Sequence, residues 1–91
     1  MILKGIFKVD EGNIGLAMQI LQSEGFSVEE SNNTLYIYEE VNPLEFNRTK
    51  AIKIIEKLQE IGVKDCEIKA YSEVPIYHYF LKEGSFVERL K

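Results

Sequence analysis

The chain has 91 residues, 45% of them apolar and 29% charged, which is the size and composition of one small globular domain. Its 11 Lys and Arg residues stand against 15 Asp and Glu residues, and the net charge of −4 argues against a nucleic-acid partner held by phosphate contacts. The single cysteine, Cys66, excludes an internal disulfide and cannot form a zinc site alone. No apolar run reaches the roughly 20 residues of a membrane span, and the first run ends too early for a signal peptide. We therefore expect a cytoplasmic protein that does not contact a membrane.

The first half of the chain predicts a strand, a helix and two further strands. Alternation over residues 2–9 is typical of a strand with one apolar face. An i, i+3, i+4, i+7 pattern then predicts a helix over residues 13–24, ended by Gly25. Strands are expected over residues 26–29 and 34–38, on either side of an Asn-rich turn. The side chains expected on the core side are Leu3, Phe7, Val9, Ile14, Ala17, Met18, Leu21, Phe26, Val28, Leu35 and Ile37.

The second half predicts a longer helix and a fourth strand. The run Asn42–Glu45 holds a cap residue, a proline suited to the first helical position and an acidic residue three places after the cap. Asn47 is a rival cap, so the first turn stays open. The helix ends at Gly62, and residues 63–72 alternate as a strand with Cys66, Ile68 and Ala70 on its core side. The buried stripe of the helix is expected to hold Leu44, Ala51, Ile52, Ile55 and Leu58, with Val41 and Phe46 packed together across its start.

The last residues, 73–91, leave two alternatives open. Apolar, β-branched and aromatic runs on either side of Gly84 favour a β-hairpin. The rival interpretation begins a helix at Pro75, ends it at Gly84 and restarts with the capping box Ser85-x-x-Glu88. In both cases residues 75–91 are too apolar for a solvated tail, and we expect this extension to pack on the sheet or on a partner subunit.

The element order over residues 1–74 is β-α-β-β-α-β, which predicts an α+β fold of the ferredoxin-like type. Such a sandwich packs two helices on one face of a four-stranded antiparallel sheet and leaves the other face open. Aromatic residues on an open face stack bases in RNA-recognition domains, although the sequence run typical of those domains is absent here. A cover formed by the extension or by a second copy of the chain is the alternative. The open face is expected to carry Lys4, Ile6, Lys8, Tyr36, Tyr38, Lys69 and Tyr71.

Candidate catalytic and metal-binding residues are few. His78 is the only histidine, lies among aromatic residues and is interpreted as a packing residue. Cys66 alternates with apolar residues, which favours a buried and unreactive thiol. The acidic pairs along the chain lack the spacing of a cation-binding loop, and no glycine-rich phosphate motif occurs. We therefore expect no catalytic residue, no metal and no cofactor.

The segments Val9–Ala17 and Ile20–Val28 together resemble the opening half of an ACT domain, in which a strand, an Asp and a Gly precede an apolar helix and a short strand. The resemblance implies a regulatory module that dimerises and binds a small ligand beside this loop. It points to Asp10, Gly12 and Asn13 as ligand contacts, with Asn13 in place of the Gly of the family's Asp-Arg-Pro-Gly. The amides at the start of a helix would favour an anionic ligand there.

These observations predict a small, non-enzymatic binding module that self-associates as a homodimer. One domain with two helices cannot cover all of its apolar side chains, and monomers seldom expose large apolar patches. Nucleic-acid binding through the open face, with Tyr36, Tyr38, Lys4 and Lys8, is one alternative, and an enzyme whose site forms between subunits is another. The interface is expected to involve Tyr36, Tyr38, Tyr71, Ile76, Tyr77, Phe80 and Phe86.

Overall fold

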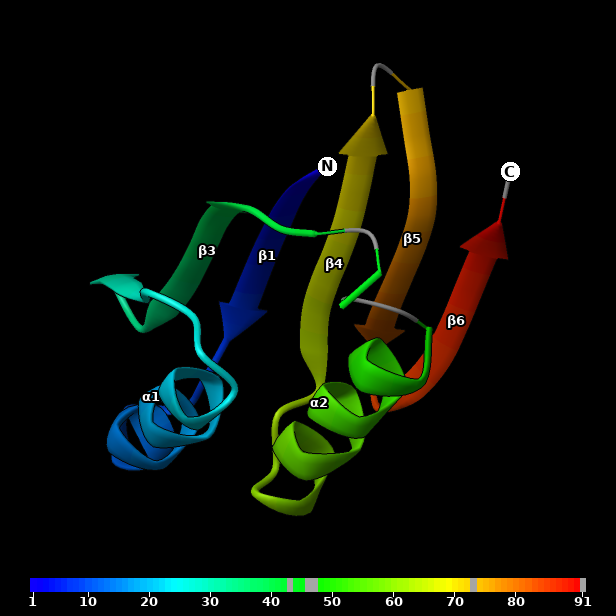
Figure 1. The fold of residues 1–91 in the computed structure, drawn as a ribbon. Helices are drawn as coiled ribbons and strands as arrows, with labels where there is room; N and C mark the ends of the chain where they lie inside the picture. The colour runs from blue at the N-terminus through cyan, green and yellow to red at the C-terminus, as the bar shows by residue number, and fades with distance from the viewer. Residues whose placement is uncertain (43, 46–47, 73, 91) are drawn as a thin grey trace.

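The computed structural model describes residues 1–42, 44–45, 48–72 and 74–90, with residues 72, 74–77 and 89–90 described by their backbone alone. These residues form an α+β fold with a six-stranded antiparallel sheet and two α-helices (Figure 1). The strands are β1 (Ile2–Lys8), β2 (Glu29–Ser31), β3 (Thr34–Glu40), β4 (Asp65–Ser72), β5 (Val74–Lys82) and β6 (Ser85–Leu90). The helices are α1 (Ile14–Ser23), which follows the short 3₁₀ helix η1 (Glu11–Asn13), and α2 (Arg48–Glu60).

The sheet has the strand order β2-β3-β1-β4-β5-β6, and every neighbouring pair is antiparallel. The first strand therefore lies inside the sheet, where Gly5 is opposite Ile37 of β3 and Ile68 of β4. Both helices pack on the same face of the sheet (Figure 1). The other face, which we call the open face, has no helix over it among the described residues.

The predicted four-stranded, ferredoxin-like sheet is wrong, because residues 74–90 add two strands to the same sheet. The hairpin alternative for this segment is confirmed, since β5 pairs with β4 on one side and with β6 on the other. Glu83 and Gly84 connect β5 to β6 with φ values of 51° and 82°, the left-handed values that a two-residue hairpin turn requires. The extension thus lengthens the sheet beyond β4 instead of folding back over it.

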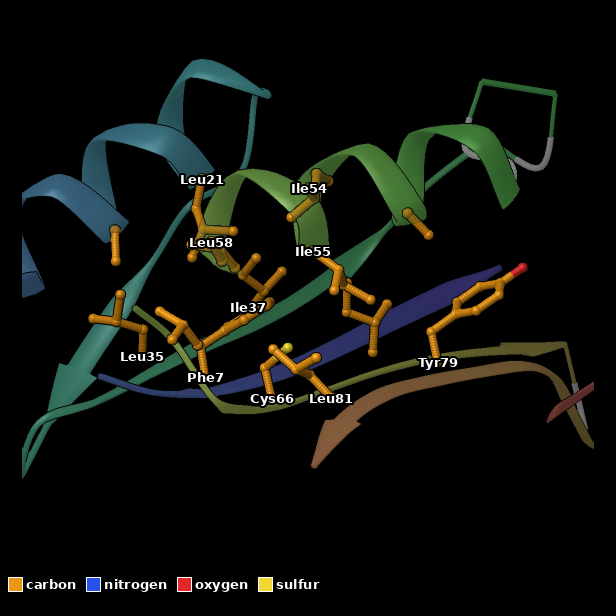
Figure 2. Close-up of a cluster of buried hydrophobic side chains, with 14 of the residues drawn as sticks. Phe7, Leu21, Leu35, Ile37, Ile54, Ile55, Leu58, Cys66, Tyr79 and Leu81 are labelled. Atoms are coloured by element: carbon orange, nitrogen blue, oxygen red, sulfur yellow. The ribbon is translucent and has the colours of Figure 1, made fainter. Parts of the chain in front are cut away.

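The core fills the space between the helices and the sheet (Figure 2). Most of the predicted core residues are buried, whereas Ile14, Met18, Val28 and Ile52 are only half-buried. The C-terminal hairpin contributes two further core side chains, Tyr79 and Leu81, so the domain core depends on it. The predicted residues that are buried are Leu3, Phe7, Val9, Ala17, Leu21, Phe26, Leu35, Ile37, Ala51, Ile55, Leu58, Cys66, Ile68 and Ala70.

Gly5 is the one glycine in β1, and the position of the Phe7 ring explains why this residue has no side chain. A Cβ built on Gly5 would lie 2.6 Å from Cε2 of the Phe7 ring, which is shorter than any normal contact. Phe7 is fully buried, so its ring has little room to move. The absent side chain at Gly5 therefore allows the largest apolar residue of β1 to enter the core.

The start of α2 differs from the prediction. The helix begins at Arg48, because the side-chain oxygen of Asn42 accepts a hydrogen bond from the Leu44 N–H at 2.9 Å and closes a local turn instead of capping a helix. Leu44 is consequently 89% exposed, and its predicted place in the buried stripe is wrong. The predicted roles of Pro43, Phe46 and Asn47 lie outside the described residues.

The second strand is also displaced from its predicted position over residues 26–29. It begins at Glu29, while Phe26 is buried in the connection that follows α1. The turn that joins β2 to β3 is confirmed, with φ values of 50° at Asn32 and 60° at Asn33, a conformation that Asn tolerates better than most residues.

Candidate functional site

The open face carries side chains in rows that run across the strands, and three of these rows form the candidate site. A fourth row, with Glu40, Ile2 and Tyr71, lies next to them at the start of β1. In the middle, the register of β3, β1, β4, β5 and β6 aligns five residues that we call the central row. The members of the central row are Tyr36, Ile6, Glu67, Phe80 and Val87. Four of the five are apolar or aromatic, so the central row forms an apolar stripe interrupted by one carboxylate.

A row that contains lysines lies on each side of the central row. On one side Tyr38, Lys4, Lys69 and His78 are aligned, and on the other side Lys8 is opposite Asp65, with Lys82 beyond it at the end of β5. We call these the outer rows. The outer rows hold four lysines and one carboxylate, Asp65, among the described residues. The other carboxylates in the described part of the open face are Glu67 in the central row, Glu29 opposite Tyr36 and Glu40 opposite Ile2. Lysines are therefore concentrated in the outer rows, while the open face as a whole, as far as the structure describes it, has as many carboxylates as lysines.

Glu67 is held in place by Lys69 and His78. One carboxylate oxygen, Oε1, lies 3.0 Å from Nζ of Lys69 and 3.1 Å from Nε2 of His78. Partial burial alone would raise the pKa of Glu67, but the hydrogen bonds and charges of Lys69 and His78 outweigh it, and the pKa is lowered. The hydrogen bond to Glu67 likewise raises the pKa of Lys69. Glu67 therefore stays ionised and fixed in orientation in the middle of the central row.

Aromatic rings on the open face have charged or aromatic neighbours. Nζ of Lys4 lies 5.7 Å from the ring centre of Tyr38, within the range of a cation–π interaction. The rings of His78 and Phe80 are 4.9 Å apart and tilted by 53°. These contacts keep the rings in place while leaving Tyr38 itself 68% exposed.

The open face is hollowed between β1, β4 and β5. The hollow has a volume of about 340 Å³, within the range of small-molecule binding sites. It contains both the carboxylate of Glu67 and the ring of Phe80 from the central row. The residues that line it are Ile6, Lys8, Asp65, Cys66, Glu67, His78, Phe80, Leu81 and Lys82.

The predicted interface residues fall into two groups. Tyr36, Tyr38, Tyr71 and Phe80 share the open face, where Tyr36 and Tyr38 are 40% and 68% exposed. Phe86 lies on the opposite side of the sheet, because its ring stacks on that of the buried Tyr79 with 6.2 Å between centres. The side chains of Ile76 and Tyr77 lie outside the described part of the structure.

Five residues of this surface were not predicted as part of it: Asp65, Glu67, His78, Lys82 and Val87. The alternation of residue types along residues 74–82 is the signal that could separate the β5 side chains facing the core from those on the open face. The pairing of each β5 residue with a residue of β4 depends on the short connection between the two strands. The register of this pairing shifts between Ala70 and Tyr71. The local sequence pattern therefore could not predict that His78 lies beside Glu67.

The loop after β1 holds the three residues that the ACT-like resemblance names as ligand contacts, Asp10, Gly12 and Asn13. The side-chain amide of Asn13 donates a hydrogen bond to the Ile61 carbonyl at 2.8 Å, which ties η1 to the end of α2. Gly12 is exposed, and a Cβ there would meet no atom within 4 Å. Asp10 lines a separate hollow of about 360 Å³ together with Lys8 and Lys64. A ligand-binding role for this loop stays a prediction.

The remaining candidate residue, Cys66, is buried as predicted, with 6% of its surface exposed. Burial raises the pKa of its thiol to about 12. Within the described residues, no group of three or more His, Cys, Asp and Glu side chains could hold a metal ion. None of the helices in that part of the chain is both long and apolar enough to cross a membrane.

No protein-family model, no curated protein and no solved structure matches this chain. Function is therefore inferred from the geometry of the open face.

Proposed function

We propose that the protein is a small, non-enzymatic binding module that presents its open face to a partner and self-associates through the edge of β6. The observation that carries this proposal is the course of residues 74–90, which extend the sheet beyond β4. This course leaves the open face uncovered and at the same time creates a new strand edge. A cytoplasmic location and the ACT-like regulatory role stay predictions within it.

Exposure of apolar side chains supports a binding role for the open face. Ile6, Tyr36 and Tyr38 are 41%, 40% and 68% exposed, although they lie on two adjacent central strands. Contiguous apolar surface of this kind, bordered by polar residues, marks binding sites on monomeric proteins. Tyrosine suits such a surface, because its ring can be buried by a partner while its hydroxyl stays hydrated.

The two edges of the sheet differ in a way that favours β6 for self-association. The β2 edge is only three residues long and carries Glu29 and Glu30, which are features that protect an edge from pairing. The β6 edge is six residues long and pairs on one side only. A two-fold axis beside β6 would pair it with β6 of a second copy in the antiparallel sense that the rest of the sheet already has.

A second copy fits the open face less well than it fits the β6 edge. Face-to-face packing would bring the lysines of the outer rows, Lys4, Lys8, Lys69 and Lys82, into one interface with their counterparts. Like charges placed opposite each other across an interface cost several kcal/mol. Pairing through β6 avoids this repulsion and leaves both open faces accessible.

Sedimentation velocity over a range of micromolar concentrations tests the proposal. In a two-residue hairpin Lys82 and Ser85 form the hydrogen-bonded closing pair, so we expect the next residue, Phe86, to direct its N–H away from β5. Phe86→Pro removes that N–H, whereas the matched control Phe86→Ala removes the ring and keeps the N–H. Circular dichroism establishes that each variant is folded.

The wild type is expected to sediment as a dimer, Phe86→Pro as a monomer, and both Phe86→Ala and Tyr38→Glu as dimers. A wild type that stays monomeric at all concentrations contradicts self-association. A dimer that is lost in Tyr38→Glu and kept in Phe86→Pro would move the interface from the β6 edge to the open face.

A further inference from the structure

We infer that the open face binds single-stranded nucleic acid, an inference that rests on the proposed binding role of that face. Three observations on the described residues carry it: the apolar central row, the lysines on both sides of it, and the hollow that Glu67 lines. Each of the three corresponds to a different part of a nucleotide chain, namely the ring faces, the phosphates and the base edges.

The central row offers surfaces on which bases can stack. Tyr36 and Ile6 are neighbours in register and are about two-fifths exposed, and Phe80 continues the row on the far side of Glu67. Tyr38 adds a further exposed ring one step away along β3. Stacking on such rings tolerates any base sequence, because every base has a flat π-face.

The lysines lie where a nucleotide backbone beside the stacked bases would place its phosphates. Lys4 and Lys69 are opposite each other in one outer row, and Lys8 occupies the other. Among the described residues, the outer rows together hold four lysines against one carboxylate, Asp65, whereas Glu29, Glu40 and Glu67 lie elsewhere on the open face. Net charge sums over all of these residues, so it does not show the two lines of lysines that flank the central row.

The hollow provides a place for a base edge. Glu67 lines the hollow and has an ionised carboxylate held by Lys69 and His78, and a fixed carboxylate accepts hydrogen bonds from the amino groups of bases. The paired rings of His78 and Phe80 line the same hollow and offer a stacking surface next to that acceptor. An acidic peptide would pair with the lysines but would leave this acceptor and the exposed rings unused.

Fluorescence anisotropy with a labelled single strand of about 12 nucleotides, a length that one small domain can cover, tests the inference. The titration is done with RNA and with DNA of mixed sequence, at low and at moderate salt, and with the matching duplex as competitor. Tyr36→Ala and Tyr38→Ala remove rings, while Tyr38→Phe keeps the ring. Lys8→Gln removes a charge from the open face, and Lys53→Gln is its matched control on the exposed side of α2.

The expected result is saturable binding that weakens as salt rises. Each Tyr→Ala variant should bind at least about fivefold more weakly, and Tyr38→Phe should bind like the wild type. Lys8→Gln should reduce the slope of log affinity against log salt by roughly 0.7, the value for one single-strand phosphate contact, and Lys53→Gln should leave it unchanged.

Absence of binding at low salt, or binding that the open-face variants leave unchanged, would overturn the inference. Equal competition by duplex would also overturn it, because stacking on exposed rings requires unpaired bases. These outcomes are separate from the sedimentation result: a dimer that binds no oligonucleotide contradicts only the nucleic-acid partner, whereas a monomer that binds it contradicts only self-association.

Discussion

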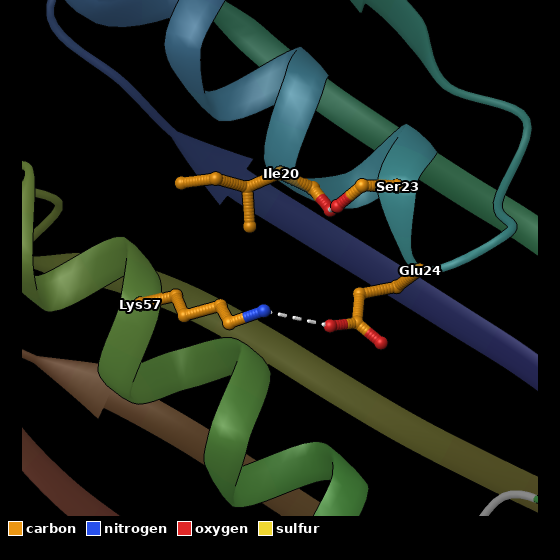
Figure 3. A network of polar contacts seen from close by, with 4 residues as sticks. All are labelled: Ile20, Ser23, Glu24 and Lys57. Atoms are coloured by element: carbon orange, nitrogen blue, oxygen red, sulfur yellow. Dashed lines mark hydrogen bonds and ion pairs between the residues drawn. The ribbon is translucent and has the colours of Figure 1, made fainter.

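The ammonium group of Lys57 lies 3.0 Å from a carboxylate oxygen of Glu24, and this ion pair joins α2 to the residue that ends α1 (Figure 3). At the same helix end, the hydroxyl of Ser23 donates a hydrogen bond to the Ile20 carbonyl at 2.7 Å. The hydrogen bond from Lys57 lowers the pKa of Glu24, and this effect outweighs the opposing effect of burial. The pair therefore contributes to how the two helices are held together over the sheet.

The Glu24–Lys57 pair should make stability depend on pH. A carboxyl with a lowered pKa in the folded state stabilises the protein above its unfolded pKa, and the contribution is lost as pH falls through the folded pKa. Glu24→Gln should lower the free energy of unfolding by about 0.5–1 kcal/mol at neutral pH and by almost nothing at acid pH. Urea unfolding at both pH values, with Glu60→Gln on the exposed side of α2 as control, measures this. A difference that stays constant with pH would contradict the assignment.

Ile55 and Leu44 have the same predicted role and opposite positions in the structure. Ile55 is 1% exposed beneath α2, so Ile55→Ala should lower the free energy of unfolding by about 2–5 kcal/mol. Leu44 is 89% exposed, so Leu44→Ala should change it by less than about 0.5 kcal/mol. Equal effects of the two substitutions on the urea midpoint would show that the start of α2 is placed incorrectly.

The thiol of Cys66 should be unreactive in the native protein. Burial raises its pKa to about 12, so the reactive thiolate is almost absent at neutral pH, and the side chain lies under the helices. A chromogenic disulfide reagent should react at a rate limited by unfolding and react rapidly once denaturant is added. Rapid modification without denaturant would contradict the buried position.

The contact between Asn13 and Ile61 should matter for stability. Asn13→Ala removes the hydrogen bond to the Ile61 carbonyl and should lower the free energy of unfolding by about 1 kcal/mol. Asp10→Ala, at an exposed position of the same loop, serves as the control and should have a smaller effect. If thermal unfolding shows no difference between the two variants, Asn13 is free for a ligand, as the ACT-like resemblance implies.

Features that depend on local pattern could be predicted from the sequence. The alternation in β1, β3 and β4 correctly predicts which side chains face the core and which lie on the open face. Leu35 and Tyr36, for example, lie on opposite faces of the sheet, as a period of two requires. The start of α2 was misplaced because the Asn42 side chain bonds to the local backbone, an alternative that the same residue types permit.

The candidate site required information that no local pattern contains. His78 meets Glu67 only because β5 pairs with β4, and the six-stranded sheet follows from the same long-range pairing. Net charge sums over the whole surface, so it concealed the lysines that the register gathers beside the central row. Both features become visible only when the strand order and register are known.

The measurement that tests the open face most directly is an NMR titration of the ¹⁵N-labelled protein with the single-stranded oligonucleotide. We expect the largest amide shift changes in β1, β3, β4 and β5, around Ile6, Tyr36 and Glu67, while amides of α1 and α2 change little. Changes concentrated on the helices, or no changes at saturating oligonucleotide, would contradict it.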